Sequence, residues 1–287
     1  MTQEKRAKQS ELLQLLLLDN LYAQSGSERI IFQGGTALRW VYGGMRFSED
    51  LDFVTDLART DIERVLAKTY PQAVNACIAQ FGRGVAEQQV KEARKSAYKI
   101  LFVFRPETQR GRIAVRLEFE MLQKGRVPAH DRFVLMNLPQ VAGLMVGGQL
   151  LLPYTSSILL AETVEEILSD KIRALLERKY LKGRDLFDIW WIVEHRRITI
   201  GWPILREKLA MYQAHFTAAR RGDYFQTREG AAEMIRALES DLTRFIPQQI
   251  VSEYRKDDFR ALIHAVDAVT RDLWDQGLRE YYETGGQ

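Results

Sequence analysis

The chain has 287 residues, is 46% hydrophobic and carries a formal net charge of +3, a composition typical of a globular protein large enough for two closely associated domains. No run approaches the roughly 20 apolar residues of a membrane-spanning helix, and the first residues do not form a signal peptide, so we expect a cytoplasmic protein. The single cysteine excludes an internal disulfide framework, and the four scattered histidines lack the spacing of a zinc site.

The first half of the chain alternates between helix and strand patterns. A leucine-rich segment predicts an N-terminal helix, and short apolar runs bounded by glycine predict buried strands. Clean alternation of apolar and charged residues marks the later strands of this half. The elements expected in chain order are a helix over 8–24, a strand over 29–32, a helix over 36–42, a strand over 51–55, a helix over 60–81 broken at Pro71, and a β-hairpin of 99–104 with 112–121.

A glycine pair precedes an alternating carboxylate pair in this half. Because side chains alternate along a strand, Ser48, Asp50 and Asp52 are expected on one face, where the two carboxylates could bind Mg²⁺ or Mn²⁺. Gly34 and Gly35 would let backbone N–H groups approach phosphate oxygens, helped by the helix expected from Thr36. Either motif alone is usually a turn or a solvated strand end. Together, with a strand before, a helix between and a strand after, they predict a nucleotidyl-transfer site.

The second strand of the expected hairpin offers a third carboxylate. Its apolar residues fall on one face, which leaves Glu118 on the other face with its charged neighbours. From a neighbouring strand, Glu118 could face Asp50 and Asp52. We therefore include Glu118 with them as a metal ligand, on strand alternation alone.

Strand signals fade after residue 155, and helical patterns continue to the C-terminus. The chain is therefore expected to be an α+β protein with a domain boundary near Tyr154, dividing it into domains 1–155 and 156–287. The helices expected in the second domain are 162–180, 184–196, 202–221, 228–245 and 251–282.

Charged residues interrupt the apolar faces of the first two of these helices. At 100° per residue, Lys171 and Arg178 fall on the same stripe as the apolar residues, where each must either extend to solvent or bind an anion such as a triphosphate. Asp185 and Asp188 lie one turn apart on a helix that is apolar nearly all round. They need cationic partners, for which Arg178 and Arg184 are the nearest choices, and a purely structural ion-pair cluster is the alternative.

Positive charge is concentrated in two segments. Residues 91–126 contain ten Lys or Arg against four Asp or Glu, and residues 171–221 contain twelve against five. Such segments could attract a polyanionic acceptor such as RNA, although solvated helix faces would give the same pattern.

Taken together, these motifs resemble the AbiEii/AbiGii nucleotidyltransferase toxins of the DNA polymerase β-like superfamily. The resemblance covers roughly residues 30–195. It rests on the pattern Gly-Gly-Thr-x-Leu, on Arg-x-Ser-x-Asp-Leu-Asp-Phe, on Lys171 and Arg178 after Glu165-Glu166-Ile167, and on Gly-Arg-Asp-Leu-Phe-Asp.

The resemblance implies a nucleotidyltransferase domain with a mixed β-sheet flanked by helices, joined to an all-helical domain that completes the active site. It implies a toxin of a bacterial toxin–antitoxin or abortive-infection module, with an antitoxin encoded nearby and no membrane partner. The expected reaction joins an NMP from an NTP to an RNA acceptor, the tRNA 3′ end being our choice, and releases pyrophosphate.

The resemblance also assigns roles to individual residues. The catalytic set is Asp50, Asp52, Lys171 and Asp185. The nucleotide-binding set is Gly34, Gly35, Thr36, Arg46, Ser48, Lys171 and Arg178. The metal ligands are Asp50 and Asp52, to which strand alternation, and not the family motif, adds Glu118.

Two alternatives stay open at this point. A metal-dependent nuclease would also use carboxylates on adjacent strands, but it usually needs Glu-x-Lys on one strand, whereas Glu118 is followed by Phe119 and Glu120, and it leaves the glycines without a role. A non-catalytic protein that binds a nucleotide or a partner would account for every motif.

Overall fold

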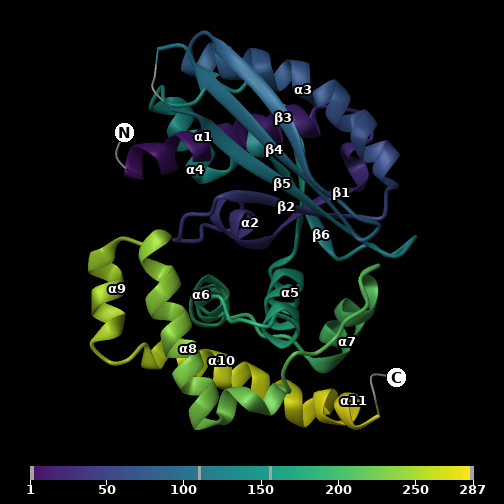
Figure 1. The fold of residues 1–287 in the computed structure, drawn as a ribbon, viewed down its shortest axis with the longest axis vertical. Helices are drawn as coiled ribbons and strands as arrows, with labels where there is room; N and C mark the ends of the chain where they lie inside the picture. The colour runs from purple at the N-terminus through teal and green to yellow at the C-terminus, as the bar shows by residue number, and fades with distance from the viewer. Residues whose placement is uncertain (1–2, 109–110, 155–156, 285–287) are drawn as a thin grey trace. The chain divides into compact units, whose positions relative to one another are not determined.

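The computed structural model describes residues 3–108, 111–154 and 157–284. The chain divides into two compact units, Met1–Glu162 and Thr163–Gln287 (Figure 1). The boundary expected between residues 155 and 156 falls on residues outside the described ranges. No helix of the described residues is long and apolar enough to cross a membrane.

The first unit contains a seven-stranded mixed sheet. The strands follow the order β3-β4-β5-β2-β1-β7-β6 across the sheet. Two neighbouring pairs, β1 with β7 and β2 with β5, are parallel, and the other pairs are antiparallel. The prediction of an α+β fold with a mixed sheet is therefore confirmed. The strands are β1 (Ile30–Gln33), β2 (Asp50–Thr55), β3 (Gly84–Ala93), β4 (Ala97–Pro106), β5 (Ile113–Met121), β6 (His130–Val134) and β7 (Ile158–Glu162).

The central strands follow the alternation expected from the sequence. On β2, Leu51 and Phe53 are fully buried. The ring of Phe53 stacks on that of Phe119 in β5, with centroids 5.1 Å apart. The intervening Asp50 and Asp52 lie on the other face and are half-buried. The apolar face of β2 thus anchors the strand that carries the two carboxylates.

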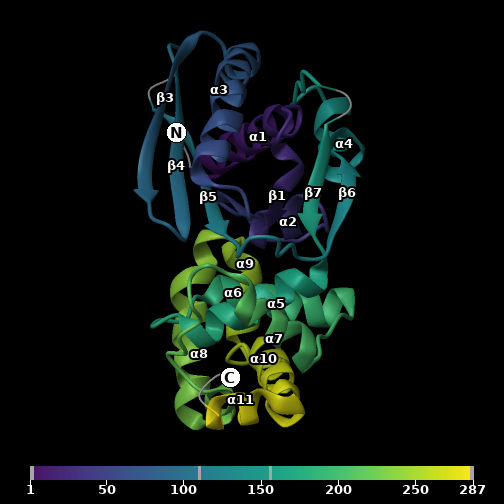
Figure 2. The ribbon, with the colours of Figure 1, turned by 90° about the vertical axis from the view of Figure 1, so that its right-hand side faces the viewer.

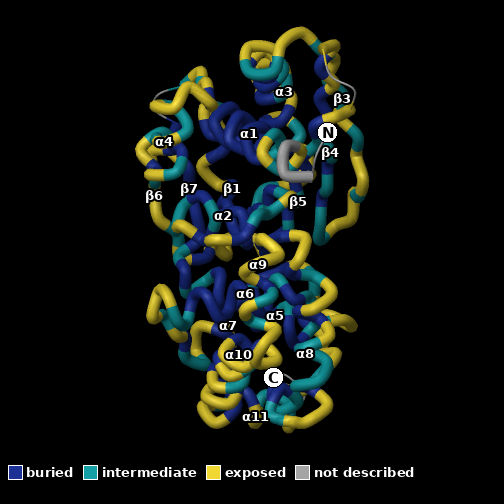
Figure 3. Tube along the Cα trace, turned by 90° about the vertical axis from the view of Figure 1, so that its left-hand side faces the viewer, coloured by how far each residue is buried: buried dark blue, intermediate teal, exposed yellow. Residues whose placement is uncertain are grey.

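Four helices accompany this sheet: α1 (Gln3–Tyr22), α2 (Gly34–Trp40), α3 (Arg59–Phe81) and α4 (Pro139–Val146). Helices α1 and α3 pack against each other on the same side of the sheet (Figure 2). The leucines of α1 are buried, as Figure 3 shows in dark blue. The break expected at Pro71 is wrong, because α3 continues through it. Pro71 has no N–H to donate to the Ala67 carbonyl. Both residues are exposed, so water can replace the lost hydrogen bond.

Several strands lacked a recognisable sequence pattern. Strand β3 is an edge strand rich in exposed polar residues, so it shows little alternation of apolar residues. Strand β7 follows residue 155, where we expected strands to have ended. Its Leu159, Leu160 and Ala161 are all buried. A short continuous apolar run of this kind cannot be distinguished from a buried helix by periodicity.

The second unit is helical in the part of the chain that the structure describes, in agreement with the prediction. The expected helix over 202–221 ends early at Met211, and the helix over 251–282 is divided. Phe259 (φ 56°) adopts a left-handed conformation between α9 and α10. The helices are α5 (Val164–Glu177), α6 (Gly183–Trp191), α7 (Trp202–Met211), α8 (Arg228–Asp241), α9 (Gln248–Arg255), α10 (Arg260–Leu273) and α11 (Arg279–Glu283).

Candidate functional site

The two glycines of the first motif lie where β1 turns into α2. Gly34 has φ +76°, a left-handed conformation that favours glycine. A Cβ atom on Gly34 would lie 2.8 Å from Oδ2 of Asp52, and one on Gly35 would lie 1.9 Å from Nη2 of Arg46. The backbone of Gly34 therefore favours glycine, and a side chain at Gly35 would have to displace the Arg46 guanidinium. The turn brings backbone against a carboxylate on one side and against a guanidinium on the other.

Asp50 and Asp52 share one face of β2, as the sequence predicted. The parallel register with β5 places Asp50 opposite Arg116 and Asp52 opposite Glu118. Nε of Arg116 lies 3.9 Å from Oδ1 of Asp50. Asp50 is the main cause of the raised pKa of Arg116. The carbonyl of Asp50 accepts a hydrogen bond from the Thr36 hydroxyl, which links β2 to the first turn of α2.

Glu118 lies beside Asp52, as expected, and its carboxylate contacts two cations. Nζ of Lys99 is 3.0 Å from one oxygen, and Nη1 of Arg116 is 2.9 Å from the other. Burial acts to raise the pKa of Glu118, but the two cations lower it below its ordinary value. Within residues 3–108, 111–154 and 157–284, no cluster of three or more His, Cys, Asp or Glu side chains is arranged to hold a metal ion. Here Glu118 belongs to a salt-bridge network.

The loop before β2 is fixed by side chains from two helices. Strand β2 begins at Asp50, so the expected strand alternation does not extend to Ser48. The Ser48 carbonyl instead accepts a hydrogen bond of 2.8 Å from Nε2 of Gln14 in α1, and Gln14 accepts one of 3.2 Å from the Trp40 indole. Arg46 is buried and donates to the Phe47 carbonyl at 3.0 Å. Gln14 carries no motif, and within a leucine-rich helix nothing in the sequence distinguished it.

In the second unit, Lys171 lies in a cluster of ion pairs. Thr163 caps α5 by accepting from the Glu166 backbone N–H, and Lys171 follows on the buried face of that helix. Nζ of Lys171 is 2.8 Å from Oδ1 of Asp185 and 2.8 Å from Oδ2 of Asp188, both on α6. The expected position on an apolar stripe is thus correct. Of the two arginines expected as partners, Arg178 does pair with Asp185, and Lys171, which was not expected as a partner, binds both aspartates.

Further cations surround these aspartates. Arg178 follows the end of α5 and pairs with Asp185. Burial acts to raise the pKa of Asp185, but Lys171 and Arg178 lower it well below its ordinary range, so the carboxylate is ionised. Burial and the nearby charges of Arg178 and Arg184 lower the pKa of Lys182, the residue before α6. The four cations Lys171, Arg178, Lys182 and Arg184 exceed the charge of the two aspartates. The cluster can therefore attract an anion.

Two other basic residues of the second unit have structural roles that the sequence did not indicate. Nη1 of Arg220 donates to the carbonyls of Leu175, at 2.8 Å, and of Arg178, at 2.6 Å, at the end of α5. Lys208 of α7 is fully buried, and its Nζ lies 3.0 Å from carboxylate oxygens of both Glu166 and Asp170 on α5. Part of the basic bias of residues 171–221 therefore stabilises α5.

The chain is similar to a known protein family and to two solved structures over most of its length. A family model described as nucleotidyl transferase AbiEii toxin, type IV TA system, matches residues 16–281. A Helicobacter pylori structure described as a candidate nucleotidyltransferase is 16% identical with a TM-score of 0.53, and covers 93% of this chain and 95% of its own. A second, JHP933 from Helicobacter pylori, is 17% identical with a TM-score of 0.55, and covers 97% of each chain. Among curated proteins, no sequence matched.

Proposed function

Because the chain belongs to the AbiEii family of nucleotidyltransferase toxins, we propose that it transfers an NMP from an NTP to the 3′ end of an RNA. The observation that carries the proposal is the pairing of Asp50 and Asp52 on one face of β2 beside the Gly34 turn. Leu51 and Phe53 of β2 pack into the core on the opposite face, and neither the carboxylate pair nor the close approach of Gly34 is needed for that packing.

The residues of β2 fit a hard divalent cation such as Mg²⁺ or Mn²⁺. Carboxylate oxygens are the ligands that these cations prefer, and a side chain at residue 34 would fill the space beside Oδ2 of Asp52. We propose Asp50 and Asp52 as the ligands. Glu118 can join them only if it exchanges contacts with Lys99 or Arg116. When bound, the cation supplies positive charge that stabilises the attacking oxygen and the leaving phosphates.

The proposed triphosphate site uses backbone and side-chain donors. The N–H groups of Gly34, Gly35 and Thr36 belong to the first turn of α2, where no carbonyl of the helix can accept them. Arg46, packed against Gly35, and the hydroxyl of Ser48 add donors. All of these groups are held by contacts within the first unit, so they are oriented before a nucleotide binds.

Lys171 and Arg178 are proposed to bind phosphate oxygens, with Asp185 as the residue that orients them. The support is the excess of positive charge around Asp185 and Asp188 and the low pKa of Asp185. An ionised Asp185 holds the Lys171 ammonium in one place. Lys171 would then be preorganised to stabilise negative charge on the departing pyrophosphate.

The proposed reaction is an in-line displacement at the α-phosphorus of the NTP. The 3′-hydroxyl oxygen of the RNA forms the new bond to the α-phosphorus, and the bond from the α-phosphorus to the bridging oxygen of the β-phosphate breaks. Pyrophosphate leaves with that electron pair, and the hydroxyl proton is released to solvent. The RNA gains one nucleotide.

We propose the tRNA 3′ end as the acceptor and a cognate antitoxin as the partner that prevents poisoning of the host. The family to which the chain belongs supports the toxin activity and the antitoxin. The basic bias of residues 91–126 and 171–221 supports a polyanionic acceptor.

The test is to incubate the purified protein with Mg²⁺, total RNA and each of the four NTPs labelled at the α-phosphate. We expect label in the tRNA band with at least one NTP. Shortened RNA without label would instead support a nuclease, and NTP binding without any change in the RNA would support a non-catalytic binding protein. Either result would reject nucleotidyl transfer.

A further inference from the structure

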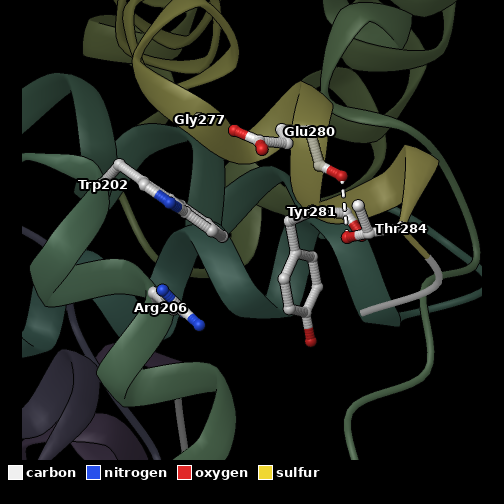
Figure 4. A pocket seen from close by; sticks show the side chains of 6 residues that line it. All are labelled: Trp202, Arg206, Gly277, Glu280, Tyr281 and Thr284. Atoms are coloured by element: carbon white, nitrogen blue, oxygen red, sulfur yellow. Dashed lines mark hydrogen bonds between the residues drawn. The ribbon is translucent and has the colours of Figure 1, made fainter. Parts of the chain in front are cut away.

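A pocket of about 320 Å³ lies in the second unit, and none of the residues proposed for nucleotide transfer lines it. Helix α7 forms one side, and the segment after α10 forms the other. The side chains of Trp202 and Arg206 extend from α7 toward Tyr281, as Figure 4 shows. The pocket is lined by Trp202, Arg206, Gly277, Glu280, Tyr281 and Thr284.

The aromatic walls are held by the backbone of the opposite segment. Gly277 has φ +147°, a non-helical conformation that kinks the chain within Trp274–Leu278, and a Cβ there would lie 2.5 Å from Cδ1 of Trp202. The Trp202 backbone N–H donates to Oε1 of Gln276 at 2.9 Å. The close approach of Gly277 and this hydrogen bond hold Trp202 in place before any ligand binds.

Tyr281 provides the second wall. Its ring centroid lies 5.4 Å from that of Trp202, with the two planes at 62°, so the rings meet at an angle. Phe216 supports Tyr281 with its centroid 6.4 Å away. Both Trp202 and Tyr281 are partly exposed, which leaves aromatic surface accessible to a ligand. A planar group could stack on either ring.

The rim combines hydrogen-bond donors and acceptors. Arg206 and Glu280 are both exposed, and the Thr284 hydroxyl lies beside them. A free phosphate is an anion and would be repelled by the Glu280 carboxylate. A nucleobase edge has both donors and acceptors, and its face suits an aromatic wall. The volume is at the lower end of the range for small-molecule pockets, which suits one base.

We propose that this pocket binds one unstacked nucleobase of the RNA acceptor. The inference rests on the proposed function for its ligand class. Tyr281 or Trp202 stacks on the base, while Arg206 and Glu280 hydrogen-bond to its edge. The pocket would then hold the RNA at a point distinct from its reacting 3′ end.

The test uses a fluorescein-labelled, single-stranded ten-residue RNA that contains 4-thiouridine. Tyr281→Leu, which keeps apolar bulk without the ring, should weaken binding about 5- to 150-fold, the usual range for loss of one stacked base. Tyr281→Phe keeps the ring and should bind within about twofold of wild type. Arg206→Gln changes an exposed side chain that folding does not need, and should weaken binding about 2- to 12-fold.

The matched control is Tyr254→Leu. Tyr254 is also partly exposed and meets a tryptophan ring, that of Trp190, at an angle with centroids 5.3 Å apart, but it does not line the pocket. This variant should leave the affinity unchanged. Photocrosslinking followed by mass spectrometry should place the thiouridine on Trp202 or Tyr281. The inference is overturned if wild type does not bind the RNA, if Tyr281→Leu binds like wild type, if Tyr254→Leu loses as much affinity, or if the crosslinks fall elsewhere.

Transfer of labelled NMP to total RNA is measured in parallel, so the two proposals can fail separately. Transfer by wild type with crosslinks outside the pocket would reject the base site and keep the proposed function. Crosslinks at Tyr281 without transfer to any RNA would keep the base site and reject nucleotidyl transfer.

Discussion

At the scale of single residues, the close approach of Gly34 to Asp52 gives the sharpest expectation. Gly34→Ala places a Cβ 2.8 Å from Oδ2 of Asp52, closer than a carbon and an oxygen normally approach, and forces a non-glycine residue into a left-handed conformation. We expect loss of transfer by about 10²-fold or more, as for removal of a preorganised group, together with about 1 to 2 kcal/mol of lost stability. Initial rates and thermal unfolding measure the two effects.

Gly125→Ala is the matched control for this change. Gly125 has nearly the same backbone conformation, with φ +79°, but an added Cβ would meet no described atom within 4 Å. It should lose a similar amount of stability and keep full activity. Equal activity of the two variants would show that the contact with Asp52 has no role in transfer.

Lys171 illustrates how the structure changes an expectation drawn from the sequence. From its position on an apolar stripe, Lys171 was expected to extend to solvent or to bind phosphate. Such a lysine could be replaced with little loss of stability. The ion pairs with Asp185 and Asp188 instead predict that Lys171→Met removes a cation that two buried carboxylates share. We expect about 3 to 5 kcal/mol of destabilisation, measured by urea unfolding.

Lys208→Met separates this structural cost from a role in catalysis. Lys208 is also buried between two carboxylates, but it has no proposed contact with substrate. The two variants should be destabilised to a similar extent. Per folded molecule, Lys171→Met should transfer about 10²-fold more slowly or worse, whereas Lys208→Met should keep the wild-type rate. Equal rates for the folded fractions would contradict the role of Lys171.

At the scale of elements, Asp19 links α1 to the segment that enters β7. Its carboxylate accepts hydrogen bonds from the Ser157 hydroxyl and from the Tyr154 backbone N–H, the latter at 3.1 Å. Burial raises the pKa of Asp19 from 3.8 to about 6. Between these values the folded protein holds the proton that the unfolded chain has lost, so stability falls as the pH rises from about 4 to about 6.

Asp19→Asn should remove this component of the pH dependence. The free energy of unfolding of wild type, measured by urea at pH 4 to 7, should decline across that window relative to the variant. At pH 7 the variant should be as stable as wild type or more stable, provided the amide keeps one of the two hydrogen bonds. If the free energies of unfolding of the two proteins change in parallel with pH, the pKa of Asp19 is not raised in the folded protein.

The elements also show where sequence patterns suffice. Strand β5 was predictable because one of its faces is fully apolar, and strand β2 because Leu51 and Phe53 alternate with Asp50 and Asp52. Strand β3 was not, because an exposed edge strand needs no apolar face. Helix α7 was predicted too long, because the chain after Met211 leaves the helix and Ala219 instead donates to the Leu176 carbonyl at the end of α5. Such long-range contacts leave no periodic signal.

The same distinction applies to the site. Strand alternation and an assumed pairing of two strands predicted that Asp50, Asp52 and Glu118 lie near one another. The observed register of β2 with β5 agrees with this prediction. The sequence could not show that Lys99 and Arg116 neutralise Glu118, since that depends on β4 and β5 lying beside β2. It likewise could not show that Gln14 fixes the loop through the Ser48 carbonyl.

At the scale of the whole molecule, we propose that the chain is a nucleotidyltransferase whose reaction depends on the carboxylates of β2. The direct measurement is the ratio of pyrophosphate released to labelled NMP incorporated into RNA, for wild type and for Asp50→Asn. We expect one pyrophosphate per NMP with wild type. We expect neither product above background with a folded Asp50→Asn protein, because a half-buried carboxylate that binds a metal is not needed for packing. Release of pyrophosphate without incorporation of NMP into RNA would contradict the proposed reaction. A wild-type rate of transfer by Asp50→Asn would contradict the proposed role of Asp50.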